Sequence, residues 1–122
     1  MHKTLLFVFT ILIIVSCSKK ESVPNGIIPP EKMAQIIAEI YNAEYKVSHV
    51  GLKHDSTKVV FRHYELKIFE DFNVSDSIYK KSFAYYLENP NELESVYDIV
   101  IDSLSLQEQV REAENRKKKD RN

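Results

Sequence analysis

Apolar side chains recur three or four residues apart through most of this 122-residue chain, and that spacing limits what it can fold into. A period near 3.6 residues places such side chains on one face of a helix, whereas a half-buried strand alternates every two residues. The spacing occurs in four segments, which are residues 30–47, 57–72, 76–88 and a stretch that begins at residue 90. The sequence therefore predicts an all-α protein, a small bundle of three to four amphipathic helices.

The segments are bounded by residues that favour helix ends. Pro30 suits a first helical turn, because its missing N–H would be unpaired there anyway. Gly51 is the expected C-cap of the first helix, and Asp55 or Ser56 is the expected N-cap of the second. Ser75 is the expected N-cap of the third helix.

The last helix has the most complete start signal. Asn89 is the expected N-cap, Pro90 fixes φ at the first position, and Glu92 supplies an acidic group in the first turn. We expect the helical domain to cover residues 30–106. Residues 107–122 are expected to form a charged helical extension that ends in a frayed basic tail.

The N-terminal sequence has the features of an export signal. An apolar run from Leu5 to Val15 follows Lys3 and is about half the ~20 residues that a membrane-spanning helix needs. A short run behind a positive charge is typical of a secretory signal peptide, here residues 1–16. The alternatives are a simple secreted protein with a chance cysteine and a signal anchor.

The end of that run resembles the bacterial lipobox, in the order Ile14-Val15-Ser16-Cys17. The resemblance implies cleavage before Cys17 and a covalent lipid on its thiol, which would anchor the chain to a membrane. Residues 17–29 are polar, then contain proline and glycine, so they are expected to form a flexible tether.

Composition narrows the possible partners and cofactors. Lys and Arg number 17 against 18 Asp and Glu, and this balance argues against a nucleic-acid-binding protein. One cysteine excludes an intramolecular disulfide and a cysteine-rich zinc site. No cofactor is expected other than the covalent lipid on Cys17.

Residue types that carry catalysis do not form a recognisable pattern. His54 and His63 are nine residues apart, not the i, i+4 spacing that places two metal ligands on one helix face, so no metal site is expected. The sequence contains no Gly-rich phosphate loop and no G-x-S-x-G motif. We therefore expect a protein that is not an enzyme.

Tyrosines and a few carboxylates are the candidate interaction residues. Tyr85 and Tyr86 are adjacent and point about 100° apart on a helix, so both cannot be central to one core. Tyrosine at the margin of a core is a frequent interface anchor, although it can also cover a rim while its hydroxyl bonds a backbone carbonyl. The same two interpretations, an interface anchor or a cover for the rim of the core, apply to Tyr41, Tyr45 and Tyr97. The proposed interaction residues are Tyr85, Tyr86, Tyr97, Glu44 and Asp98.

Three sets of residues form a recognisable pattern. The first is Ile28-Pro29-Pro30-Glu31-Lys32-Met33 with Ile36, Ile37, Ile40 and Ala43-Glu44. The second is Tyr64 with Ile68-Phe69 and Asn73-Val74-Ser75, and the third is Ser82-Phe83-Ala84-Tyr85-Tyr86 with Asn89-Pro90, Leu93, Tyr97-Asp98 and Val100. On these residues the chain resembles the DUF4296 family of small Bacteroidota lipoproteins between Ile28 and Leu104. Asn42 stands where the family pattern implies an apolar residue or histidine. The family name implies a helical lipoprotein and supplies no reaction.

This resemblance implies an outer-membrane lipoprotein. The resemblance implies that lipoproteins exported to the cell surface carry a short acidic signal after the cysteine. In this chain Ser18-Lys19-Lys20-Glu21 has one acid, so the periplasmic face is favoured over the cell surface. We expect a lipid-anchored protein-interaction module, an accessory subunit of an envelope assembly or transport machine, with an envelope protein as partner. The alternative is a periplasmic carrier or enzyme acting on an envelope lipid or glycan.

Overall fold

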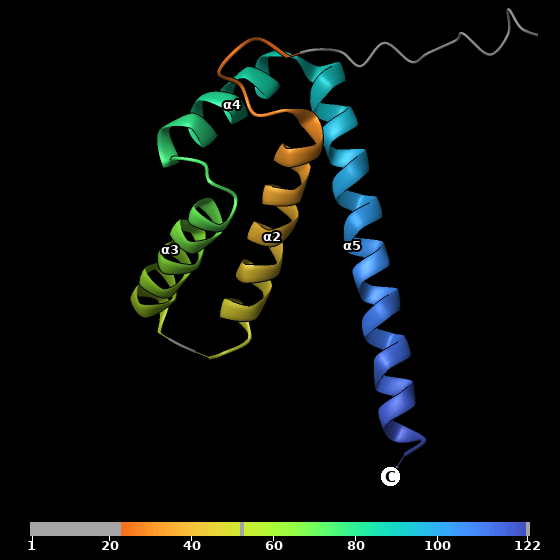
Figure 1. The fold of residues 1–122 in the computed structure, drawn as a ribbon. Coiled ribbons are helices and arrows are strands. Elements are labelled where there is room, and N and C mark those ends of the chain that lie inside the picture. Colours follow the sequence, from red (N-terminus) through yellow and green to blue (C-terminus); the bar gives the residue numbers. More distant parts are fainter. Residues whose placement is uncertain (1–22, 52, 122) are drawn as a thin grey trace, which may run out of the picture.

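The computed structural model describes residues 23–51 and 53–121, and this part of the chain contains four helices and no strand (Figure 1). The predicted all-α bundle is confirmed. The predicted signal peptide, Cys17 and the first part of the tether lie outside the described residues. The helices are α2 (Pro30–Ser48), α3 (His54–Asp71), α4 (Asp76–Glu88) and α5 (Pro90–Lys119).

Helix α2 is the centre of the fold. It lies between α3 and α5 and packs against both, while α4 crosses one end of the bundle and contacts α5 (Figure 1). Because α2 has neighbours on two sides, its buried surface is wider than a single stripe. Three of the buried residues of α2 are alanines, which let the neighbouring helices approach closely. The full set is Met33, Ala34, Ile36, Ile37, Ala38, Ala43 and Val47.

The core gathers where α2, α4 and α5 meet. Its largest side chains with less than 2% exposure are Tyr86, Met33, Ile36, Val96, Val100 and Ser82. Helix α3 contributes Phe69, its one buried residue, and the ring of Phe69 lies 4.8 Å from that of Tyr79 on α4. The fold therefore depends on α2 and α5 more than on α3.

The segment before α2 is fixed rather than flexible. The Ile28 backbone N–H donates to Ser82 Oγ at 2.9 Å, and the Tyr86 hydroxyl donates to the Ile28 carbonyl at 2.7 Å. Ile28 itself is buried, and Gly26 turns the chain with a φ of +84°, which glycine adopts without steric cost. The prediction of a flexible tether that ends at residue 29 is therefore wrong for residues 23–29, because this segment packs onto α4.

The first turn region differs from the sequence prediction in detail. Helix α2 ends at the C-cap His49, two residues before Gly51, although Gly51 does have a positive φ of +70°. Helix α3 begins after Lys53, three residues earlier than predicted, so neither Asp55 nor Ser56 is its N-cap. Those two side chains lie inside the first turn instead.

The turn from α3 to α4 follows the prediction and has a defined geometry. Asn73 takes a left-handed φ of 51°, its N–H bonds the Glu70 carbonyl, and the Val74 N–H bonds the Phe69 carbonyl. This pair of bonds is the Schellman arrangement, which satisfies carbonyls that a helix end leaves open. Ser75 then caps α4 as predicted, because its hydroxyl accepts from the Ile78 N–H at 3.2 Å.

Helix α5 begins where the sequence indicates and ends later. Asn89 is its N-cap residue, but the Asn89 side chain donates to the Tyr85 carbonyl rather than capping α5. The helix has 30 residues, about 45 Å at 1.5 Å per residue, and continues through residues 116–119, which were expected to fray. Every residue from Ser105 to Arg121 is exposed.

A helix that crosses a bilayer must be both long and apolar. Among the described residues, none of the helices combines the length and the apolar character that crossing a bilayer requires.

Candidate functional site

An open groove lies between α2 and α5. The two helices diverge toward the C-terminal end of α5 (Figure 1), and the space between them has a volume of about 560 Å³. We call this space the α2/α5 groove. Its lining residues are Tyr41, Asn42, Tyr45, Lys46, Leu104, Gln107, Glu108 and Arg111.

Helical spacing explains why these residues meet. The four on α2 are residues i, i+1, i+4 and i+5, and the four on α5 are residues i, i+3, i+4 and i+7. Both sets therefore form a single face of their helix. The faces look toward each other because α2 and α5 already pack together nearer the core.

A hydrogen bond joins the two walls of the groove. The Asn42 amide Nδ2 donates to Gln107 Oε1 at 2.7 Å, across 65 residues of sequence. Asn42 is the position at which the chain departs from the resemblance, and the departure supplies this polar link. An apolar side chain there could not make the bond.

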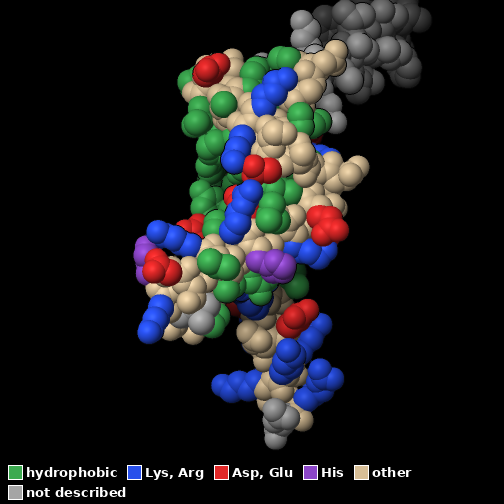
Figure 2. Space-filling model, turned by 90° about the vertical axis from the view of Figure 1, so that its left-hand side faces the viewer, with side chains coloured by type: hydrophobic (Ala, Val, Ile, Leu, Met, Phe, Trp, Pro, Cys, Tyr) green, Lys and Arg blue, Asp and Glu red, His purple; other side chains and the backbone are tan. Residues whose placement is uncertain are grey.

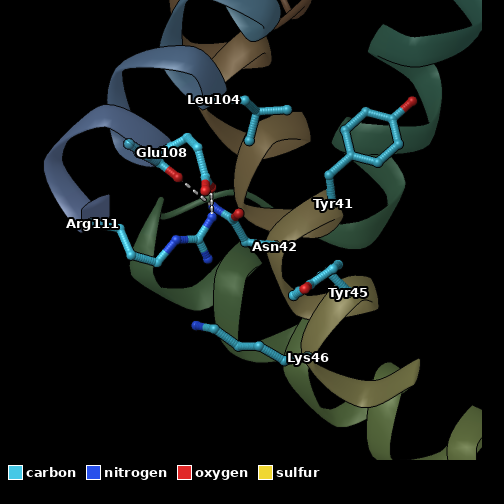
Figure 3. A pocket seen from close by; sticks show the side chains of 8 residues that line it. Tyr41, Asn42, Tyr45, Lys46, Leu104, Glu108 and Arg111 are labelled. Atoms are coloured by element: carbon cyan, nitrogen blue, oxygen red, sulfur yellow. Dashed lines mark hydrogen bonds and ion pairs between the residues drawn. The ribbon is translucent and has the colours of Figure 1, made fainter. Parts of the chain in front are cut away.

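Two partly exposed tyrosines give the groove its apolar surface. Tyr41 is 43% and Tyr45 is 58% exposed, and both project from α2 (Figure 3). The Tyr45 ring lies 4.1 Å from the ring of His49. Tyrosine offers a large rigid surface with a polar tip, which is why it is enriched in binding surfaces. Leu104, on the opposite helix, adds an aliphatic contact to the same groove.

Cationic side chains extend into the groove from both walls. Lys46 projects from α2 and Arg111 from α5, and both reach toward the space between the helices (Figure 3). Arg111 is paired with Glu108 one turn earlier on α5. The groove thus combines apolar tyrosine faces with two cations and one carboxylate, a mixture suited to a side chain that carries negative charge.

Phenols on three helices come together at the end of the groove nearest α4. Burial first, then the charge of Glu65, raises the pKa of Tyr79 from 10.0 to about 12. Burial also raises the pKa of Tyr97, and a hydrogen bond with Tyr41 adds to that rise. These tyrosines therefore stay neutral over the physiological pH range and act as packing and hydrogen-bonding groups.

The structure separates the predicted interaction residues. Tyr86 is 0% exposed, and its hydroxyl bonds a backbone carbonyl, so it is a core residue and not a surface anchor. Tyr85 lies at the margin as expected and donates to Glu92 Oε1 at 2.9 Å. Tyr97 is half-buried beside Tyr41, close to the groove.

The two predicted carboxylates do not join the groove. Asp98 is exposed on α5. Glu44 is exposed and lines a smaller hollow of about 210 Å³ between α2 and α3, together with His54, Lys58 and Phe61. Within the described ranges, the His, Cys, Asp and Glu side chains form no group of three or more that could hold a metal ion.

Sequence reasoning missed most of the groove. It noted Tyr41 and Tyr45, and Asn42 only as a departure from the family pattern, but it did not note Lys46 or Gln107. These polar residues lie beside the apolar stripe, where a helix normally faces water, so only the packing of α2 against α5 shows that they share a site.

Fold and groove together define a small all-helical protein with an open surface site. The family model described as "Domain of unknown function (DUF4296)" matches residues 24–110, and the chain belongs to this family. The match covers α2, α3, α4 and the first two thirds of α5, and it ends one residue before Arg111 of the groove. Comparison with curated proteins and with solved structures gives no match.

Proposed function

We propose that this protein is a lipid-anchored helical interaction module of the outer membrane that docks a protein partner in the α2/α5 groove. The observation that supports this proposal most is the groove itself, where Tyr41 and Tyr45 expose aromatic surface in a space that Lys46 and Arg111 also line. A few exposed aromatic anchors commonly supply most of the affinity of a protein interface. The predicted lipid on Cys17 supports a position at the membrane.

The chemistry of the groove indicates what the partner presents. An apolar or aromatic side chain would pack on the tyrosine faces and on Leu104. A neighbouring carboxylate would lie between Lys46 and Arg111, where the two cations face one space (Figure 3). We therefore propose that the occupant is a segment of a larger envelope protein that carries an acidic residue next to an apolar one.

Such a docking groove suits an accessory subunit of an envelope assembly or transport machine better than it suits a carrier. A carrier or enzyme for an envelope lipid or glycan needs an enclosed site that removes most of its ligand from water. The groove is open, and its tyrosines are about half exposed. That geometry favours a macromolecule that covers the groove from outside.

Photo-crosslinking in native membranes tests the proposal. The full-length chain would carry benzoylphenylalanine at position 45, inside the groove, or at position 64 as a matched control. Tyr64 is a tyrosine on α3 with 44% exposure, close to the 43% of Tyr41, and lies outside the groove. We expect one dominant protein adduct from position 45 that is absent from position 64.

A charge variant adds a second requirement. Lys46→Glu in the position-45 chain is expected to reduce the adduct about tenfold or more, because a like charge would meet the partner's carboxylate. No adduct at position 45, or equal adducts at 45 and 64, would contradict the proposal.

A further inference from the structure

The C-terminal part of α5 is a helix without packing support of its own. Every residue from Ser105 to Arg121 is exposed, and Figure 1 shows α5 continuing past the ends of α2 and α3. Apart from the bond between Gln107 and Asn42 on α2, its described charged pairs are local, Arg111 with Glu108 and Arg116 with Glu112. Such exposed pairs stabilise a helix only weakly, and an isolated helix of about 15 residues is marginal in water.

This exposed part of α5 carries an apolar stripe on the side away from the groove. Leu104, Gln107 and Arg111 face α2. At about 100° per residue, Leu106, Val110 and Ala113 lie together on the opposite side, spaced four and then three residues apart. We call these three residues the outer stripe; Leu106 and Val110 are among the most exposed large apolar side chains of the described chain.

Acidic and basic side chains occupy different parts of α5. Between Pro90 and Asp102 the helix has four carboxylates and no lysine or arginine. Between Asn115 and Arg121 there are five lysines and arginines and one carboxylate. Figure 2 shows these blue side chains gathered around the protruding end of the molecule.

The helix dipole explains only part of this division. Acidic groups in the first turn and basic groups in the last turn are stabilised by the dipole, and the effect fades within one turn. Glu92 and the run Arg116–Lys119 satisfy that rule. Asp98 and Asp102 lie two to three turns inside the helix, so their placement needs another explanation.

We propose that a second copy of this chain packs antiparallel against the outer stripe of α5. A two-fold axis near residue 108 places Leu106 against Val110 of the second copy, and the reverse, which is the a-to-d pairing of an antiparallel coiled coil. The same register brings Asp102 within about 3 Å, along the helix axis, of Arg116 of the second copy. Asp98 faces the Lys117–Lys119 run of that copy.

The proposed dimer satisfies the charges of both copies at once. Two Asp102–Arg116 pairs flank the apolar centre, related by the two-fold axis, and the symmetry closes the assembly at two chains. A parallel arrangement would place the basic ends side by side, so electrostatics selects the antiparallel one. This interface lies opposite the α2/α5 groove, so it does not depend on the proposed function.

The size of the contact sets the expected affinity. An overlap of about 20 residues spans roughly 30 Å of helix, at the small end of specific interfaces. We therefore expect a dissociation constant in the micromolar range, about 1 to 100 µM.

Sedimentation velocity of the full-length protein in density-matched detergent, from about 1 to 300 µM, tests the assembly over that range. The wild-type chain should pass from monomer to dimer. Leu106→Glu should raise the dissociation constant at least about tenfold, because it places a charge at the apolar centre. Ile101→Glu is the matched control, since Ile101 is also 62% exposed on α5 but points away from the outer stripe.

A charge swap tests the register. Asp102→Arg alone and Arg116→Asp alone should each weaken the dimer, and the two substitutions in one chain should restore it. Circular dichroism at 222 nm checks that every variant keeps its helices. A monomeric wild type at the highest concentration, equal effects of Leu106→Glu and Ile101→Glu, or a double variant no better than the single ones would each overturn the proposal.

Discussion

Individual side chains hold the start of the fold in place, and Ile28 shows how. Both polar groups of its backbone are buried, and each has one partner on α4, Ser82 for the N–H and Tyr86 for the carbonyl. A buried backbone group left without a partner costs roughly 1–3 kcal/mol. Ser82 therefore acts through its hydroxyl as well as through its small size.

Tyr86→Phe tests this contact. The substitution keeps the ring and leaves the Ile28 carbonyl unpaired, so we expect the free energy of unfolding to fall by about 1–2 kcal/mol. Urea denaturation followed by circular dichroism measures the change. Tyr45→Phe is the control, and it should change stability by less than about 0.5 kcal/mol because Tyr45 is exposed. Equal effects of the two substitutions would show that the Tyr86 hydroxyl bond is not stabilising.

The buried tyrosines also predict a pH dependence. Burial is the main cause that raises the pKa of Tyr79 and of Tyr86 to about 12. The unfolded chain loses these protons near pH 10, before the folded chain does, so the folded state binds more protons between pH 10 and 12. Stability is therefore fully present below pH 10 and declines as pH rises through 12.

Absorbance at 295 nm measures this directly, because it reports the phenolate. We expect a late phenolate titration step near pH 12 from Tyr79 and Tyr86, coincident with loss of helical signal. Tyr79→Phe should shrink the late step. A single step near pH 10 with the helices intact would contradict the burial of both rings.

Among the elements, α5 has two parts with different roles. Its first half buries Val96 and Val100 against α2 and α4, whereas residues 105–119 contact nothing that the core needs. Parts of a structure with few buried contacts contribute little to global stability. The long helix is therefore a core element at one end and a presented surface at the other.

Truncation after Glu108 separates the two roles. We expect the free energy of unfolding to change by less than about 1 kcal/mol, because the removed residues are exposed. Val100→Ala, in the first half, should cost about 1–3 kcal/mol through lost burial and a cavity. Thermal and urea unfolding of both variants compare these losses, and a truncation as costly as Val100→Ala would show that the extension supports the core.

Sequence pattern was most informative where local chemistry alone sets the structure. Ser75 and the Asn73-Val74 turn were predictable, because capping and left-handed turns depend on a few adjacent residues. The start of α3 at His54 was not, since no side chain caps it. The early end of the tether was also missed, because Ile28 is ordered by partners more than 50 residues away.

At the scale of the whole molecule, the arrangement of the helices creates the site. Four amphipathic segments could be predicted from spacing, but the central place of α2 could not. The divergence of α5 from α2 could not be predicted either, since it follows from how far the core extends along each helix (Figure 1). The α2/α5 groove opens where the core ends. The sequence therefore marks Asn42 only as a departure from the family pattern, and nothing in it indicates that Asn42 and Lys46 line one site.

The most direct test of the central claim is quantitative affinity purification of the tagged full-length protein from its native envelope. The wild-type chain should return one partner in near-stoichiometric amount. Tyr45→Ala with Lys46→Glu should lose that partner, and Tyr64→Ala should keep it, because Tyr64 is similarly exposed but lies outside the groove. A partner retained by all variants, or no stoichiometric partner for the wild type, would contradict the assignment of the α2/α5 groove as a docking site.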